Sequence, residues 1–275
     1  MQGGGNAYNL RELAGAFGDL GTLIPFLVGY ITISKMDPVG ILVSFGLFKI
    51  IAGLYFKTPI PIQPMKAIGT AVASEPALLS ELGHMAWRLR LPALALTKLG
   101  PSDLRTGILV LGLPQVGLTL GNAIIATVEE NNTVFPARPT TVKTVAIDHG
   151  LMNLVGASLG GVPMCHGAGG MAAHIRFGAR TGGALVILGS LILFVGLFFA
   201  DSVATLFKLF PRALLGVILM FGGLELAAGV HENPVRKEDR YVMLLTAGVS
   251  LWNMGVGYVA GLVLWHAYQR GWLKA

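Results

Sequence analysis

One stretch decides the fold that this sequence predicts: Pro163-Met164-Cys165-His166-Gly167-Ala168-Gly169-Gly170-Met171-Ala172-Ala173-His174. It is too rich in glycine for an ordinary membrane span, and its surroundings are too apolar for a surface loop. Proline suits the first turn of a helix, because the N–H that it lacks would have no partner there. The glycines behind it leave backbone amides uncovered, so an anion can sit on the positive end of the helix dipole. The stretch therefore predicts a broken helix whose N-terminus can bind an anion.

A second, shorter copy of this pattern lies upstream, at Pro59-Ile60-Pro61-Ile62-Gln63-Pro64-Met65-Lys66-Ala67-Ile68-Gly69. Both copies contain Pro-Met, followed by polar residues and then by small ones. Interrupted hydrophobic segments in corresponding positions of two halves point to the binding site of a transporter. The pair therefore predicts two interrupted segments at the binding site of a transporter.

The composition indicates a polytopic, all-α membrane protein. Hydrophobic residues make up 53% of the chain and charged residues 12%, and the mean hydropathy is +0.68. These values exclude an ordinary soluble protein. The formal net charge is +6, but the Lys and Arg residues are scattered between apolar segments and form no patch. Membrane topology explains them better than nucleic acid does, so we expect a lipid bilayer around the chain and no nucleic-acid partner.

The single cysteine, Cys165, excludes an intramolecular disulfide and a cysteine-based zinc cluster. We expect no metal and no stored cofactor. The N-terminus is glycine-rich and polar before Arg11 and Glu12, which is not the pattern of a cleavable signal peptide.

The first half of the chain predicts two spans and one half-span. Residues 13–33 and 39–56 are apolar and long enough to cross a bilayer core, which needs about 20 residues. The first carries Asp19 and the second carries Lys49. Residues 60–74 have only the length of a half-span, which predicts an extended entry followed by a half-helix.

The second half predicts more spans than the first. They are expected at residues 106–128, 145–162, 184–200, 204–226 and 241–268, the last as a re-entrant pair around Asn253. Inverted-repeat transporters usually have halves of similar size. We therefore expect one membrane transport domain, 1–275, whose first repeat is incomplete. Its expected parts are first-repeat core helices at 13–75, a shortened junction at 76–105, second-repeat core helices at 106–182 and gate-type helices at 183–275.

Several motifs in the same order resemble the molybdate transporter family within the sulfate-permease superfamily. They are Phe17-Gly18-Asp19-Leu20-Gly21-Thr22, Pro61-Ile62-Gln63-Pro64-Met65-Lys66-Ala67, Leu113-Pro114-Gln115 with Leu120-Gly121-Asn122-Ala123, Pro163 to Gly170, and Arg176-Phe177-Gly178-Ala179-Arg180-Thr181-Gly182. The resemblance implies an inverted-repeat, core-and-gate transporter with two half-helices that meet at mid-membrane and hold the substrate between their N-termini. It also implies import of molybdate, a tetrahedral dianion, and it is compatible with a homodimer. Such a protein should carry several more spans between the Lys66 and Asn122 motifs.

The expected substrate-binding residues are the half-helix starts and the polar groups that the motifs place near them. They are Asp19, Gln63, Pro64, Lys66, Gln115, Asn122, Pro163, Cys165, His166 and Gly167. No catalytic residue is expected, because adjacent residues such as Cys165 and His166 do not face each other on a helix and no other thiol-activating group is visible.

Each of these residues also has a structural interpretation. Lys66 can attract a dianion or extend to the membrane interface. His166 can donate to an oxyanion, carry a proton or satisfy a backbone carbonyl. Asp19 can couple protons or order the core by accepting hydrogen bonds. The amides of Gln63, Gln115 and Asn122 suit oxyanion donors and equally suit interhelical hydrogen bonds.

We expect a multi-pass plasma-membrane transporter that imports molybdate and is coupled to protons or to an exchanged ion. Asp19 and His166 are the candidates for the titrating group. A sulfate or other oxyanion transporter of the same fold is one alternative. A transport-incompetent anion-binding protein is another, because of the short first half.

Overall fold

The structure, a computed structural model, describes residues 5–65, 88–94, 100–203 and 236–273 and the single positions 217, 220 and 224. It is helical apart from one pair of very short strands. The predicted span at 204–226, the junction up to residue 87 and the half-helix after Met65 lie outside the described residues, except for those single positions. Lys66 is among the residues left out.

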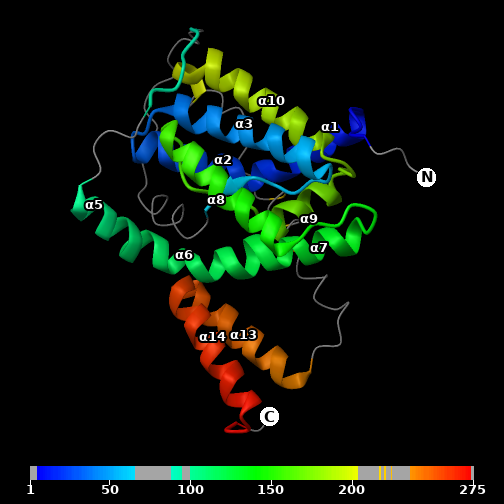
Figure 1. The fold of residues 1–275 in the computed structure, drawn as a ribbon, viewed down its shortest axis with the longest axis vertical. Coiled ribbons are helices and arrows are strands. Elements are labelled where there is room, and N and C mark those ends of the chain that lie inside the picture. The colour runs from blue at the N-terminus through cyan, green and yellow to red at the C-terminus, as the bar shows by residue number, and fades with distance from the viewer. Residues whose placement is uncertain are drawn as a thin grey trace.

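Two long helical segments open the chain (Figure 1). The first consists of α1 (Leu10–Ala16), a 3₁₀ turn η1 (Phe17–Asp19), α2 (Leu20–Val28) and a π-helical end η2 (Gly29–Ile33). The second is α3 (Pro38–Phe56), which begins where the side chain of Asp37 accepts a hydrogen bond from the Val39 N–H. Residues 10–31 and 38–56 are long and apolar enough to cross a membrane, which agrees with the two predicted spans.

The two Pro-Met copies meet as extended chain in the core. Strand β1 (Gln63–Pro64) pairs antiparallel with β2 (Met164–Cys165), with Gln63 opposite Cys165. Helix α9 (Ala168–Arg176) follows β2, so the half-helix predicted after the second copy is confirmed. The extended entry predicted before the first half-helix is confirmed as well.

The part of the sequence between the two Pro-Met copies forms a long helical run that crosses the molecule (Figure 1). Its parts are α5 (Pro101–Thr106), π-helical η3 (Gly107–Gly112), α6 (Leu113–Leu118), π-helical η4 (Thr119–Ala126) and α7 (Thr127–Val134). It is longer at both ends than the span predicted at 106–128. Helix α8 (Val142–Ser158) then leads to β2, and the side chain of Thr141 caps its start.

Helix α10 (Gly183–Phe198) packs along α3, and the 3₁₀ turn η5 (Ala200–Ser202) follows it. The two helices approach closely at glycines: a Cβ on Gly189 would lie 2.7 Å from the Gly46 carbonyl oxygen. Small residues at such contacts allow membrane helices to pack backbone to backbone. Helices α1, α2, α3, α8, α9 and α10 form the body of the molecule around a buried apolar core (Figure 1).

The C-terminal pair, α13 (Lys237–Trp252) and α14 (Met254–Gln269), extends away from this body (Figure 1). The break at Asn253 was predicted, and the Asn253 side chain caps α14 by accepting from the Val256 N–H. Helix α14 contacts α6, where the ring of Tyr258 lies against Gly117.

Candidate functional site

The crossing of β1 and β2 is held in place from α8. The Nδ2 of Asn153 donates to the Met164 carbonyl at 2.7 Å, and its Oδ1 accepts from the Met164 N–H at 2.9 Å. This side-chain amide therefore pairs with β2 as a third strand would. On the other side, the Met65 N–H donates to the Pro163 carbonyl at 2.9 Å and the thiol of Cys165 faces the Pro64 carbonyl at 3.5 Å. These bonds join β2 both to α8 and to the first copy.

The N-terminus of α9 begins directly at this crossing and lies inside the protein. Gly167 occupies the cap position with extended backbone and no capping side chain. Its carbonyl accepts from the N–H groups of Gly170 and Met171 at 3.0 and 3.1 Å. Within the described segments, the N–H groups of Ala168 and Gly169 have no hydrogen-bond partner. The buried helix start therefore presents unpaired donors and the positive end of its dipole.

The side chain of Gln63 lies over this helix start, and two glycines make room for it. A Cβ on Gly170 would lie 2.1 Å from Gln63 Nε2, and a Cβ on Gly167 would lie 2.6 Å from Gln63 Oε1. Gln63 Nε2 donates to Oδ1 of Asp19. Since a carboxylate only accepts, this bond fixes the amide with Oε1 towards Gly167. The glycines of the second copy are therefore needed for contact with the first copy.

Asp19 is the centre of a fully buried polar group. Its Oδ2 lies 2.6 Å from Nζ of Lys49, and both side chains are 0% exposed. His174 places Nε2 at 3.9 Å from the same oxygen and donates from Nδ1 to the Gly15 carbonyl at 2.8 Å. We call Asp19, Lys49, Gln63 and His174 the Asp19 cluster. Its carboxylate has a cation, so it can remain ionised in the core.

A second carboxylate–histidine contact lies on the other side of the crossing. His166 Nδ1 is 3.0 Å from the Pro61 carbonyl, and its Nε2 is 3.0 Å from Oδ2 of Asp148 on α8. The imidazole is 0% exposed, whereas the Asp148 side chain is 19% exposed. The ring of Phe56 packs edge-on against the imidazole at 6.2 Å, and the ring of His149 lies 5.9 Å away.

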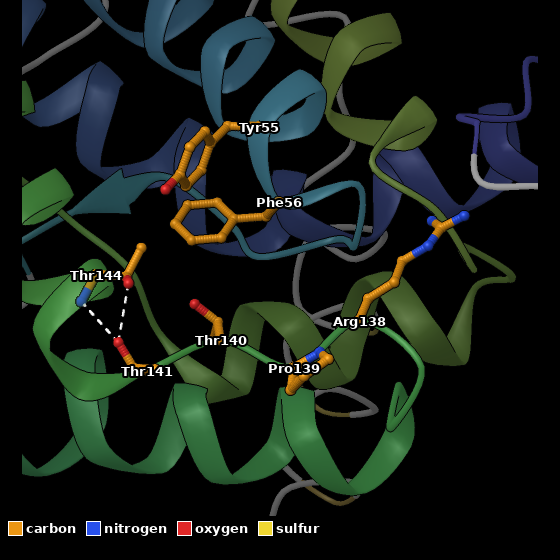
Figure 2. Close-up of a pocket in the computed structure, with 7 residues that line it drawn as sticks. All are labelled: Tyr55, Phe56, Arg138, Pro139, Thr140, Thr141 and Thr144. Carbon is orange, nitrogen blue, oxygen red and sulfur yellow. Dashed lines mark hydrogen bonds between the residues drawn. The ribbon is translucent and has the colours of Figure 1, made fainter.

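A pocket of about 260 Å³ opens at Phe56, the residue whose ring packs on the His166 imidazole. Figure 2 shows the rings of Tyr55 and Phe56 on one side and the loop before α8 on the other. Arg138, at the edge of the pocket, donates to the carbonyls of Lys57 and Gly5 and so joins the loop to the end of α3. The pocket is lined by Tyr55, Phe56, Arg138, Pro139, Thr140, Thr141 and Thr144.

The structure brings most of the predicted site residues to the crossing. They are Asp19, Gln63, Pro64, Pro163, Cys165, His166 and Gly167. Asn122 reaches it from η4, since a Cβ on Gly167 would lie 3.4 Å from Asn122 Nδ2. Gln115 lies on the same helical run and donates to Thr119 Oγ1 at 3.3 Å. Lys66 is outside the described residues.

Four buried or partly buried polar residues at this site were not predicted to belong to it: Lys49, Asp148, Asn153 and His174. The pairing of Lys49 could have been predicted from the sequence, because a lone cation in one apolar span and a lone anion in the preceding span favour an ion pair. Asp148 precedes the central stretch by less than a membrane span, and only the folded chain shows that α8 returns alongside it.

Comparison with known proteins agrees with the resemblance of the motifs. Residues 11–96 and 107–226 match the family described as "Molybdate transporter of MFS superfamily". Molybdate transporter 1 of Chlamydomonas reinhardtii is 37% identical over 209 residues, which cover 73% of this chain and 40% of that protein. Molybdate transporter 2 of Arabidopsis thaliana is 39% identical over 165 residues, or 59% of this chain and 35% of that protein.

The chain spans about two fifths of the length of these relatives. Among solved structures, the transmembrane domain of a cyanobacterium bicarbonate transporter, BicA, aligns with 91% of this chain and 77% of its own, at 16% identity and a TM-score of 0.41. The family match covers most of the chain and includes the Asp19, Gln63, Asn122 and His166 motifs. The chain belongs to the molybdate transporter family.

Proposed function

We propose that this chain is a multi-pass transporter of the plasma membrane that imports molybdate. Membership of the molybdate transporter family supports the substrate and the membrane location. The observation that carries the proposal is the buried start of α9, where the N–H groups of Ala168 and Gly169 have no partner in the described part of the chain. Such a helix start attracts an oxyanion through its dipole and its donors.

The residues around this helix start suit a tetrahedral oxyanion. Asn122 adds a side-chain donor beside Gly167, and Gln63 closes the space above Gly167 and Gly170. Lys66 directly follows β1 and Met65, so it adds a cation at the matching position of the first copy. In this proposal, the cluster around Asp19 orients Gln63 and does not touch the anion.

The charge of molybdate requires coupling. An inside-negative potential costs about 2.3 kcal/mol per charge per 100 mV, so a dianion costs about 4.6 kcal/mol to import at that potential. A co-transported proton or an exchanged ion offsets this cost. We therefore propose coupled uptake, and no chemical step on the substrate.

We further propose that the first half is shortened within the sulfate-permease-like architecture. The two matched segments of the family are separated by residues 97–106, which overlap the end of the expected junction at 76–105. This supports a shortened repeat between the core helices and the second repeat. In this proposal two copies of the chain form a homodimer, in which the second copy completes the gate that the helices at 183–275 begin.

The test is uptake of labelled molybdate into proteoliposomes that contain this chain, with excess sulfate as competitor. We expect uptake that resists sulfate and is lost in Lys66→Ala. The matched control is Lys143→Ala, because Lys143 is exposed in the first turn of α8, away from the crossing. Uptake abolished by sulfate would favour a general oxyanion transporter. Binding of molybdate without flux would indicate a transport-incompetent scaffold.

A further inference from the structure

We propose that Asp148 and His166 together form the proton-binding site that couples the transporter, with one proton held between His166 Nε2 and Asp148 Oδ2. This inference rests on the proposed function for its ligand, molybdate. It assigns the coupling ion as a proton and names Asp148 as the second half of the site.

The two partners of the His166 imidazole determine how many hydrogens its ring nitrogens carry. The Pro61 carbonyl, 3.0 Å from Nδ1, can only accept, so Nδ1 carries a hydrogen. A neutral imidazole has one N–H, and Nε2 would then direct a lone pair at a carboxylate oxygen 3.0 Å away. Two acceptors at that distance repel each other, whereas a proton between them gives an ion pair of ordinary length. Neither Nε2 nor Oδ2 has another hydrogen-bond partner among the described residues.

The pair can exchange its proton because one side of it reaches solvent. The Asp148 side chain is 19% exposed although the imidazole is 0% exposed. The pocket of Figure 2 ends at Phe56, whose ring packs on the imidazole, and at Thr144, one helical turn before Asp148. The exposed part of the Asp148 side chain can therefore take up a proton without passing through the buried core.

The pair also lies where its charge matters to the substrate. His166 is bonded to Gly167, whose carbonyl accepts the first hydrogen bonds of α9. Taking up a proton changes the pair from a net charge of −1 to 0, which removes a repulsive charge beside the anion site. Binding of a dianion therefore favours protonation, and by linkage protonation tightens anion binding by the same factor.

The other titratable groups near the pair do not replace this role. His149 on α8 faces the imidazole at 5.9 Å, and neither of its ring nitrogens has a partner among the described residues. The thiol of Cys165 is directed at the Pro64 carbonyl, and Arg138 and Tyr55 line the pocket. On the opposite side of the crossing, Asp19 already holds Lys49.

The experiment measures protons and molybdate separately on the purified full chain in lipid nanodiscs. Nitrogen-15 NMR of labelled histidines reports whether His166 Nε2 is protonated, with His166→Gln to assign the signal. A pH indicator in weak buffer reports proton uptake when molybdate is added, and equilibrium dialysis reports bound molybdate. We expect molybdate to raise the protonated fraction of His166 Nε2, with a matching uptake of protons from solution. Both effects should be lost in Asp148→Asn and restored in Asp148→Glu.

The matched control is His149→Gln, one residue away on the same helix, which should keep both signals. An unprotonated Nε2 in the wild-type chain over the range of about pH 5 to 8, where histidines titrate, would overturn the inference even if the Asp148 variants fail to fold. Wild-type binding of molybdate without proton uptake, or uptake that survives Asp148→Asn, would overturn it as well. Failure of the wild-type chain to bind molybdate would instead refute the proposed function, while the NMR result still decides whether the pair holds a proton.

Discussion

Two carboxylate–histidine contacts flank the crossing of β1 and β2, and they differ in what surrounds the carboxylate. Asp19 lies 2.6 Å from the Lys49 ammonium and accepts from the Gln63 amide, with His174 at 3.9 Å. Asp148 has the imidazole of His166 at 3.0 Å. Asp19 is fully buried, whereas the Asp148 side chain is 19% exposed.

The surroundings of each carboxylate determine whether it is suited to a structural role or to binding a proton. A buried carboxylate with its own cation is neutral as a pair, and losing either charge leaves the other uncompensated. A carboxylate whose partner is a histidine forms a pair whose net charge changes by one when a single proton binds. The Asp19 cluster is therefore suited to orienting Gln63 over α9, and the Asp148–His166 contact is suited to binding a proton.

The largest loss of stability is expected for Lys49→Met, which tests the Asp19 side of this contrast. It leaves the Asp19 carboxylate buried without its cation, for which we expect a loss of about 3–5 kcal/mol in stability. Thermal unfolding of the purified protein in detergent measures the loss. The double variant Asp19→Asn/Lys49→Met removes both charges and should recover a large part of it, and Lys143→Met, at an exposed position, should cost little. A Lys49→Met protein as stable as the wild type would refute the ion pair.

The second test, Gly170→Ala, adds a methyl group in the space that the Gln63 side chain of the same cluster occupies. The new Cβ would lie 2.1 Å from Gln63 Nε2 and 3.1 Å from Asp19 Oδ1, so Gln63 must move and its bond to Asp19 must break. A bond to a charged group contributes about 1.5–3 kcal/mol, and we expect a loss of that size together with weaker molybdate binding. Thermal unfolding and equilibrium dialysis measure the two effects.

Gly150→Ala is the matched control for that substitution. Gly150 lies in α8, and a Cβ there would have no atom within 4 Å among the described residues. Alanine is the better helix former, so this variant should be as stable as the wild type or slightly more stable. If both alanine variants behave alike, Gly170 is not a contact for Gln63.

The sequence predicts the helices of this chain well because local signals specify them. Apolar runs of membrane length, Asp37-Pro38 before α3 and Asn253 before α14 each mark an element by composition or capping. The 3₁₀ turn at Phe17–Asp19 was not predicted. It depends on contacts from other helices, since a Cβ on Gly18 would lie 2.6 Å from the Ala173 carbonyl oxygen.

The site was predicted by residue type but not by pairing. Asp19, Gln63 and His166 were expected to bind substrate, and that stays a prediction. The structure adds that they lie beside Lys49, Asp19 and Asp148, respectively. These contacts join residues far apart in the chain, and a single sequence does not reveal which distant groups meet. The sequence also does not reveal that Gly170 leaves space for Gln63, because a glycine at a helix start can serve several different purposes.

A third test asks whether a buried carboxylate needs a cation at all. Glu12 is 2% exposed, and its two oxygens accept from the N–H groups of Arg180, Thr181 and Ala184 at 2.9, 3.0 and 3.2 Å. These bonds hold the start of α10, where the helix dipole also favours a negative charge. We expect Glu12→Gln to cost about 1–2 kcal/mol, less than Lys49→Met, because an amide keeps one acceptor and places a donor against the others.

Thermal unfolding again measures this loss. Glu238→Gln, at a partly exposed position in the first turn of α13, is the control of equal chemistry and should change stability less. A loss after Glu12→Gln as large as that of Lys49→Met would mean that hydrogen bonds alone are as important to a buried carboxylate as an ammonium group. The contrast between the two clusters would then rest on exposure and not on charge pairing.

The smallest effect is expected at the surface, where Arg90 bridges two helix ends. Its guanidinium lies 2.6 Å from Asp201 and 3.2 Å from Asp37, and all three side chains are more than a third exposed. Exposed ion pairs contribute about 0–1 kcal/mol and weaken with salt, so Arg90→Ala should lower stability by less than about 1 kcal/mol, and less still in about 1 M salt. The backbone bonds of Arg88 and Arg90 to the end of α10 remain in the variant. Thermal unfolding at low and high salt measures the effect. A salt-insensitive loss comparable to that of Lys49→Met would mean that this end of the molecule is buried against something in the membrane, and that burial, and not the presence of a cation, sets the strength of both ion pairs.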